Sequence, residues 1–219
     1  MISRCQEICK AASTLFIRQG YSRTQINHIA KSIGVSVGTI YHEFAGKKEI
    51  MQFVLKCTIS PEFLDRELKK PITEDLFCNL NMDIETKFDS VLNEFSTHTS
   101  KKNYSFENYI SDAFDLVSQY AVCILFIEKN QYEFETLAAY YTKFRARFFD
   151  IMKTAFTNFI DKGDIRTPKY IDYAVLHIIE TLTLWGMDIH YKNYNVLNIS
   201  PETAKNVVFD NLIPLFTKK

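Results

Sequence analysis

Apolar residues recur every three or four positions along most of this chain, which is the spacing of an α-helix with one buried face. The first such stretch runs from about Ser3 to Gln19 and stops at Gly20. Three shorter stretches follow closely, and they predict helices at 24–33, 37–44 and 47–59. The four helices together indicate a compact N-terminal unit.

The helical pattern lengthens after residue 60. A hydroxyl residue followed by Pro suits a helix N-cap and the first helical position, and this pair occurs at Ser60-Pro61, Thr167-Pro168 and Ser200-Pro201. Pro214 should kink or end the last helix. We expect helices at 61–70, 73–95, 105–127, 131–160, 168–191 and 201–216, with a polar loop at 96–103. The pattern therefore predicts an all-α protein of about nine helices, in which a larger C-terminal bundle follows the N-terminal unit.

Composition agrees with long helices. The chain has six Gly and five Pro in 219 residues, fewer than the turns of a β-sandwich or barrel need. Its 47% of hydrophobic residues can fill a sizeable core and excludes a disordered chain. No apolar run approaches the roughly 18 residues of a membrane span, and Arg4, Glu7 and Lys10 interrupt the stretch where a signal peptide would be apolar. We expect a soluble, cytoplasmic protein without membrane contact.

The charges divide unevenly along the chain. The totals are 26 Lys and Arg against 26 Asp and Glu, so the net charge is zero, which taken alone argues against a nucleic-acid partner. Residues 1–56, however, hold eight cations and three anions, and the other residues carry the opposite excess. A basic head on an acidic body is typical of a DNA-binding domain at 1–56 and a sensing and dimerising domain at 57–219.

One short constellation carries most of the functional information. Ala30 lies in the second predicted helix, Gly34 follows four residues later, and Ile40 lies six residues further on. Two helices that cross steeply need a small residue at their contact, a Gly in the turn and an apolar residue that locks the second helix onto the first. This spacing predicts a DNA-binding helix-turn-helix within a three-helix head, whose second helix, at 37–44, enters the major groove.

The same stretch resembles the TetR-type transcriptional regulators. The matching residues are Gly20-Tyr21, Thr24, Ile29-Ala30, Gly34-Val35-Ser36, Gly38-Thr39-Ile40-Tyr41-His42, Phe44 and Lys47. The resemblance implies a homodimeric, ligand-responsive repressor that binds a near-palindromic operator in double-stranded DNA.

Nine residues are candidates for DNA contact under this resemblance. Thr24 and Ser36 have the alternative of capping helices, and Asn27 could equally be a solvated surface residue. Glu43 departs from the family's commoner His or Tyr and is expected to place a negative charge near the DNA backbone. The candidates are Thr24, Asn27, Ser36, Val37, Gly38, Thr39, Tyr41, His42 and Lys47.

The C-terminal bundle is expected to dimerise through its last two helices and to hold a small effector. The resemblance implies a four-helix interface that uses Tyr173, Leu176, Ile179, Thr183, Val208 and Leu212, although these faces could instead pack within one chain. Aromatic residues of the central helices could line a pocket for an apolar or aromatic molecule, or could simply form the core. They include Phe106, Tyr109, Phe114, Tyr140, Phe144 and Trp185.

Other functions have weaker support in the sequence. Cys5 and Cys9 share a helical face, but no further ligand follows at metal-binding spacing, so free thiols are favoured over redox sensing or metal binding. We expect no metal and no cofactor. Scattered Gly and His residues offer no catalytic constellation, which argues against an enzyme. A helical adaptor that binds proteins instead of DNA is the main alternative to the regulator.

Overall fold

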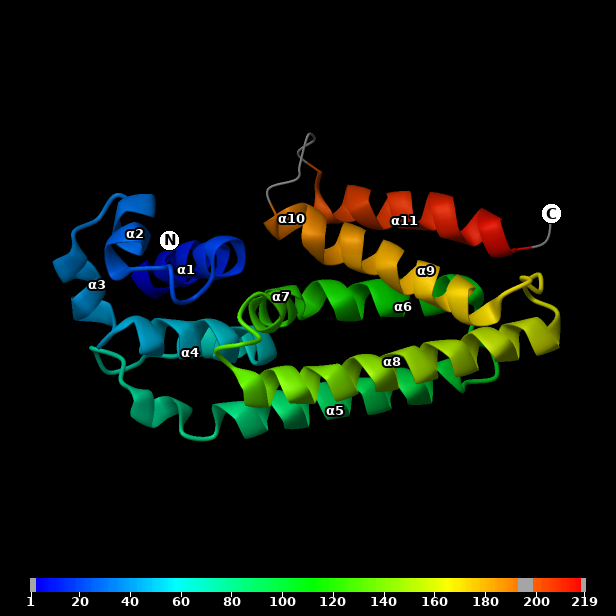
Figure 1. The fold of residues 1–219 in the computed structure, drawn as a ribbon, viewed down its shortest axis with the longest axis horizontal. Helices are drawn as coiled ribbons and strands as arrows, with labels where there is room; N and C mark the ends of the chain where they lie inside the picture. Colours follow the sequence, from blue (N-terminus) through cyan, green and yellow to red (C-terminus); the bar gives the residue numbers. More distant parts are fainter. Residues whose placement is uncertain (1–2, 193–198, 218–219) are drawn as a thin grey trace. The chain divides into compact units, whose positions relative to one another are not determined.

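The structure, a computed structural model, describes residues 3–192 and 199–217 and consists of helices joined by short connections (Figure 1). No strand occurs within these residues; two isolated β-bridges pair Phe44 with Ile72 and Ile165 with Thr217. The prediction of an all-α fold is confirmed.

The helices are named in chain order. They are α1 (Arg4–Gln19), α2 (Ile26–Ser32), α3 (Val37–Glu43), α4 (Lys47–Ile59), η1 (Pro61–Asp65), η2 (Glu74–Phe77), α5 (Leu80–Thr99), α6 (Phe106–Gln119), α7 (Ala121–Lys129), α8 (Glu135–Lys162), α9 (Ile171–Thr183), η3 (Leu184–Asp188), α10 (Ile189–Tyr191) and α11 (Pro201–Phe216).

The chain forms two compact units. The first comprises Met1–Lys87 and Val122–Ala138, and the second comprises Phe88–Ala121 and Ala139–Lys219. This division reflects packing, whereas the boundary after residue 56 concerns function and stays a prediction.

The first unit is built around α1 and α4. These helices pack against each other, α2 and α3 pack on α1, and η1 and η2 pack on α4. Ile8, Phe16, Ile29, Ile40 and Ile50 are fully buried between them. Apolar residues at helical spacing thus fold the N-terminal stretch as predicted, and segments after residue 60 complete its core.

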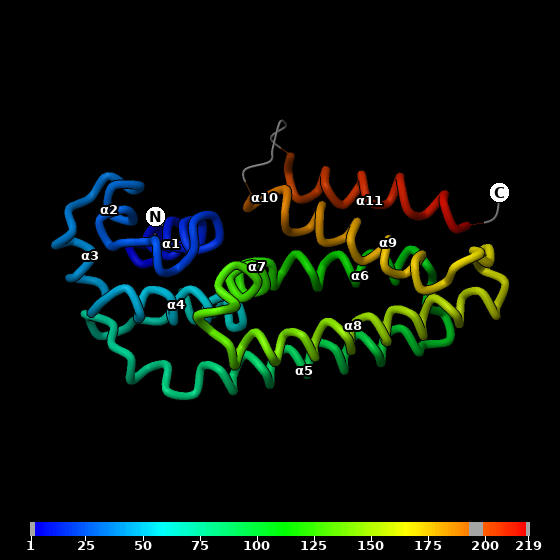
Figure 2. Tube along the Cα trace, viewed as in Figure 1, coloured from blue at the N-terminus to red at the C-terminus, as the bar shows by residue number. Residues whose placement is uncertain are grey.

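The second unit has an aromatic core. Within it, α5 and α8 lie side by side (Figures 1 and 2), and Phe88 of α5 packs against Phe144 of α8 with tilted rings whose centroids are 4.8 Å apart. Tyr109 of α6 is fully buried, and its hydroxyl donates to the Met152 carbonyl at 3.1 Å. α9 and α11 pack on α6.

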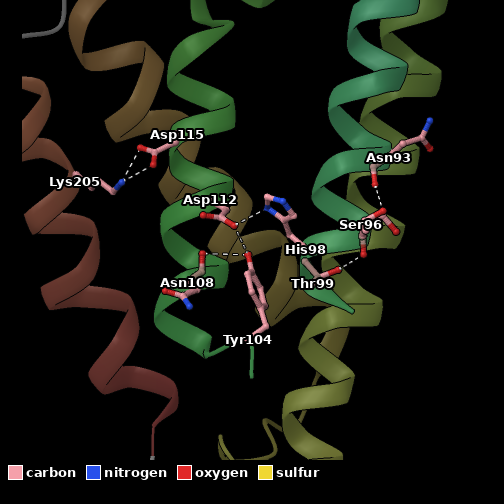
Figure 3. Close-up of polar contacts among 10 residues, drawn as sticks. Asn93, Ser96, His98, Thr99, Tyr104, Asn108, Asp112, Asp115 and Lys205 are labelled. Carbon is pink, nitrogen blue, oxygen red and sulfur yellow. Dashed lines mark hydrogen bonds and ion pairs between the residues drawn. The ribbon is translucent and has the colours of Figure 1, made fainter. Parts of the chain in front are cut away.

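Polar contacts at the surface of the second unit hold α6 to its neighbours (Figure 3). The Tyr104 hydroxyl donates to Asp112 Oδ2 at 2.9 Å, and His98 Nδ1 lies 3.5 Å from the same oxygen. Lys205 of α11 donates to both Asp115 oxygens at 2.7 Å. These contacts tie the end of α5 and the middle of α11 to α6.

Several predicted helix ends are wrong. The 61–70 segment forms only the 3-10 turn η1, and α5 starts later than expected and continues through the predicted loop to Thr99. The 105–127 helix breaks at Tyr120, and α9 begins at Ile171, beyond the Thr167-Pro168 pair. The last helix passes Pro214 and ends at Phe216. Pro214 lies in the final turn at the surface, so only one exposed backbone hydrogen bond is lost there.

Within the described residues, no single helix has the length and apolar character to cross a membrane. The successive helices α6 and α7 reach this threshold only when they are taken together as a broken pair.

Candidate nucleic-acid interface

The turn between α2 and α3 has the geometry of a helix-turn-helix. Gly34 has φ +70°, a left-handed conformation that favours Gly, and the Val35 N–H donates to the Ala30 carbonyl at 3.0 Å. Ala30 and Ile40 are buried where the two helices meet. The predicted roles of Ala30, Gly34 and Ile40 in this turn are confirmed.

The first turn of α3 is held by its own cap. Ser36 Oγ accepts a hydrogen bond from the Thr39 N–H at 3.1 Å, and the two hydroxyl oxygens lie 2.9 Å apart. Ser36 therefore satisfies a backbone donor that an uncapped helix leaves open. Both hydroxyl groups are engaged with each other at the start of α3.

α3 has a buried and an exposed face. Ile40 and Phe44 point into the core and are inaccessible to solvent. Val37 and Tyr41, four residues apart, share the exposed side of the helix and expose 40% and 50% of their surface. Large apolar side chains that are exposed on a short helix indicate a surface that can bind a partner.

Glu43 does not face this surface. It is buried, its Oε2 accepts a hydrogen bond from Cys5 Sγ at 3.0 Å, and the same oxygen pairs with Lys70 Nζ. Burial alone would raise the pKa of the Glu43 carboxyl, but hydrogen bonds from Cys5, Lys70 and His42 outweigh it and hold this pKa below its ordinary value. The expectation of a negative charge at the DNA backbone was wrong, because the charge is turned inward and paired.

The end of α3 is also held by backbone contacts from a distant segment. The Ile72 N–H donates to the Glu43 carbonyl at 2.8 Å, and the Ala45 N–H donates to the Ile72 carbonyl at 2.9 Å. This segment and Lys70 fix the orientation of α3. No local pattern in the sequence signals either contact.

The turn after α1 is closed by its own polar groups. Gly20 has φ +93°, and the hydroxyl of the fully buried Thr24 donates to its carbonyl at 2.7 Å. Gln19 Nε2 donates to Thr24 Oγ1 at 3.1 Å. The N-cap of α2 is Gln25, so the predicted capping role of Thr24 was wrong. Its hydroxyl closes the turn instead.

The backbone of the next residue, Tyr21, is hydrogen-bonded to side chains from two other segments of the chain. Asn130, which follows α7, accepts a hydrogen bond from the Tyr21 N–H at 2.6 Å, and Lys47 Nζ donates to the Tyr21 carbonyl at 2.9 Å. The Lys47 ammonium also lies 4.1 Å from the centre of the Tyr21 ring. Asn130 is buried and donates in turn to the Phe126 carbonyl at 2.7 Å. Asn130 was not predicted from the sequence, since a single Asn after an apolar helix carries no distinctive signal.

The candidate DNA contacts therefore differ in their access to solvent. Thr24 is buried, Thr39 and Lys47 are half-buried, and the others are exposed: Asn27, Ser36, Val37, Gly38, Tyr41 and His42. Cations that could meet phosphate are exposed nearby; they include Arg23, Lys31 and Lys48, of which Lys48 pairs with Glu74 at 2.6 Å.

The predicted pocket residues lie in the aromatic core of the second unit. Four of them are buried, namely Phe106, Tyr109, Phe114 and Phe144, and two are half-buried, namely Tyr140 and Trp185. Their role in an effector site stays a prediction.

The predicted dimer residues fall on two faces. Tyr173 and Leu176 are exposed, whereas Ile179, Val208 and Leu212 are buried within the chain, where α9, α11 and α6 pack together. Thr183 is half-buried and donates to its own helix. The exposed apolar stripe on this side comprises Tyr173, Leu176 and Leu184.

The five cysteines are free thiols. Burial, followed by the hydrogen bond to Glu43, raises the pKa of Cys5 to about 12, which keeps it a thiol at neutral pH. Within residues 3–192 and 199–217, no group of His, Cys, Asp or Glu side chains has an arrangement that could hold a metal ion.

A tight glycine turn, a short helix with its acid turned inward and nearby exposed cations define the class of helix-turn-helix DNA-binding proteins. Residues 8–53 match the family model described as bacterial regulatory proteins, tetR family. This match makes the N-terminal segment similar to the corresponding segment of the TetR family.

Two relatives of known name match a short segment of the chain. The HTH-type transcriptional regulator SrpR of Pseudomonas putida is 40% identical over 60 residues, which are 27% of this chain and 28% of SrpR. The HTH-type transcriptional repressor KstR2 of Mycolicibacterium smegmatis is 35% identical over 63 residues, which are 29% of this chain and 28% of KstR2. The match thus spans little more than a quarter of the length of either relative.

Solved structures show the same fold over the whole chain. The ketosteroid transcriptional regulator KstR2 of Mycobacterium tuberculosis superimposes with a TM-score of 0.59 at 15% identity, and the match covers 100% of this chain and 97% of that one. A Saccharomonospora viridis protein in complex with choline has a TM-score of 0.50 at 14% identity, with 98% of each chain covered. At this identity the likeness concerns the fold alone.

Proposed function

We propose that the protein is a transcriptional repressor that binds operator DNA as a homodimer, with α3 of each protomer in the major groove. The observation that carries this proposal is the exposed face of α3, where Val37, Tyr41 and His42 are open to solvent while Glu43 is buried. Because this surface has no free carboxylate, it does not repel the negatively charged phosphates of DNA. The match of a 63-residue segment to a named repressor supports the direction of regulation.

The cations of the N-terminal head supply the general affinity for DNA. Arg23 and Lys31 are exposed close to α2 and α3, and residues 1–56 have an excess of five positive charges. Phosphate contacts position a protein on the duplex, while side chains of α3 select the sequence. Lys47 contributes mainly by holding Tyr21, because its ammonium is engaged inside the head.

The exposed stripe on α9 and the start of η3 is the proposed dimer contact. Tyr173, Leu176 and Leu184 lie at intervals of three and eight residues, which places them along one helical face. A C2 dimer would bury this stripe against its own copy and set two α3 helices on successive major grooves.

The proposed effector is a small apolar or aromatic molecule, bound in the cytoplasm by the aromatic-rich second unit. Phe114, Tyr140 and Trp185 are the candidate contacts. Supporting neighbours are the M. tuberculosis regulator named for ketosteroids and the S. viridis structure with choline. Effector binding would lower DNA affinity by the difference in its affinity for the two head arrangements.

The DNA-binding part of the proposal is tested with the full chain and the DNA that flanks its own gene. We expect the double variant Thr39→Ala, Tyr41→Ala to weaken DNA binding at least about 100-fold, because each protomer loses two predicted contacts with its operator half-site. The matched control is Tyr132→Ala, since Tyr132 is 86% exposed and lies outside the helix-turn-helix. Fluorescence anisotropy measures binding, and circular dichroism checks that helicity is kept. Operator affinity equal to that of the control would refute the assignment of α3.

The adaptor alternative makes a different prediction. An adaptor would show neither sequence-selective nor salt-dependent DNA binding, whereas the repressor should lose affinity steeply as salt rises. A titration between low and physiological salt separates the two.

A further inference from the structure

The two hydroxyl groups in the first turn of α3 are hydrogen-bonded to each other. Ser36 and Thr39 hold each other, with their hydroxyl oxygens 2.9 Å apart and Ser36 Oγ capping the Thr39 N–H. Gly38 has no side chain. Val37, the first residue of α3, is the aliphatic group that this turn exposes, at 40% of its surface.

Gly38 allows the first turn of α3 to approach another molecule closely. A Cβ at position 38 would meet only Ser36 Oγ, at 3.6 Å, and the backbone there is not in the left-handed region. The fold therefore does not require Gly at this position. A missing side chain beside Val37 instead lets the helix start approach another surface closely.

The edges of the four base pairs differ in what an aliphatic group can contact. Guanine, cytosine and adenine present hydrogen-bond donors and acceptors in the major groove, and thymine adds a 5-methyl group. Val has no donor or acceptor, so desolvating a polar base edge against it costs free energy, while contact with a methyl group gains it.

On the basis of the proposed function, we propose that Val37 is a specificity-determining residue that selects thymine in each operator half-site through the 5-methyl group. Base contacts come from the N-terminal part of a recognition helix, which is where Val37 lies. Tyr41 lies one turn later and has a hydroxyl group that suits phosphate. The operator should therefore contain one thymine per half-site whose methyl group, and not its hydrogen-bonding edge, is read.

Deoxyuridine tests this directly, because it pairs like thymidine but lacks the 5-methyl group. An operator is first selected from a random duplex library with the full chain, and each thymine is then replaced singly by deoxyuridine. We expect one position per half-site to weaken binding about fourfold, the effect of one buried methyl group, and both together about 15-fold. Replacement of a thymine outside the protected region is the control.

The variant Val37→Ala tests whether Val37 is the residue that contacts the thymine methyl group. Because Val37 is exposed, the variant should keep its helicity and melting temperature. It should bind the thymidine and deoxyuridine operators with equal affinity, close to that of the wild type on the deoxyuridine operator.

The outcomes are distinguishable. A chain that selects no DNA sequence overturns the proposed function and this inference with it. A chain that selects a sequence but is indifferent to every 5-methyl group overturns the inference alone. A methyl effect that persists in Val37→Ala also overturns it, since another residue then reads the thymine.

Discussion

At the scale of single residues, Glu43 shows how a charge beside the proposed DNA-binding surface is turned inward and paired. Its carboxylate is buried behind His42 and held by Cys5 and Lys70. The hydrogen bonds that lower the pKa of Glu43 also stabilise the ionised, folded form, so stability depends on pH.

We predict that Glu43→Gln flattens the acid side of the stability profile. The pKa of Glu43 is lower in the folded than in the unfolded state, so its contribution is complete above the ordinary pKa of a Glu side chain and is lost as pH falls from there through the lowered pKa of the folded state. At pH 7 the wild type should be more stable than Glu43→Gln by about 1–2 kcal/mol, and the two should converge at acid pH. Urea unfolding between pH 7 and pH 3 measures this.

The exposed Glu67 provides a control for this comparison. Glu67→Gln should follow the wild-type profile throughout. Identical profiles for the wild type and Glu43→Gln would show that the buried pair contributes nothing to stability.

Residue roles were predictable from the sequence only where their partners are local. Gly34, Ser36 and Ile40 act within one turn of the chain, and their spacing revealed them. Glu43 was misjudged because its partners Cys5 and Lys70 lie far away in the sequence. Asn130 was missed for the same reason, because it contacts Tyr21 across 109 residues.

At the scale of elements, the clearest departure from the sequence pattern is η3. The pattern of apolar residues predicted one helix over 168–191, but residues Leu184–Asp188 form a π-helical turn, in which the Ile189 N–H donates to the Leu184 carbonyl. This turn sets Gly186 against α6: a Cβ on Gly186 would lie 2.7 Å from Ser118 Oγ. That oxygen is buried and has no hydrogen-bond partner.

We predict that Gly186→Ala destabilises the protein by about 1–2 kcal/mol, because steric strain exceeds the gain in helix propensity. Ser118→Ala should be neutral or slightly stabilising, since it removes an unpaired buried hydroxyl. In the double variant the cost of Gly186→Ala should largely disappear. Thermal unfolding of the four proteins gives the coupling energy, and additive effects would contradict the contact.

The helices were predictable because burial of one face imposes the helical period on the sequence. Their ends were less predictable, since packing decides them. The pattern of apolar residues does not reveal the break at Tyr120. α11 passes Pro214 because this residue lies in the exposed final turn, where only one backbone hydrogen bond is lost.

At the scale of the whole molecule, the exposed stripe on α9 and the start of η3 determines the proposed assembly. We predict that Leu176→Asp with Leu184→Asp raises the dimer dissociation constant roughly 100-fold or more, because each charge would be buried twice across a C2 interface. Sedimentation velocity should then show monomers at micromolar concentration.

Leu76 is a matched control for this experiment, because it is 45% exposed but lies in η2. Leu76→Asp should leave the association state unchanged. A double variant that still sediments like the wild type would place the interface elsewhere.

The hydrogen bonds of Tyr21 with Asn130 and Lys47 limit how the N-terminal head could be exchanged between proteins. A chimaera that joins residues 1–56 to another body would leave behind Asn130, Lys70 and Ile72. The Tyr21 N–H and the Glu43 carboxylate would then lose the partners that satisfy them. The residues that hold the proposed DNA-binding head together are therefore not contiguous in the sequence. A chimaera should keep the head intact only when it also includes the segment through Ile72 and the end of α7.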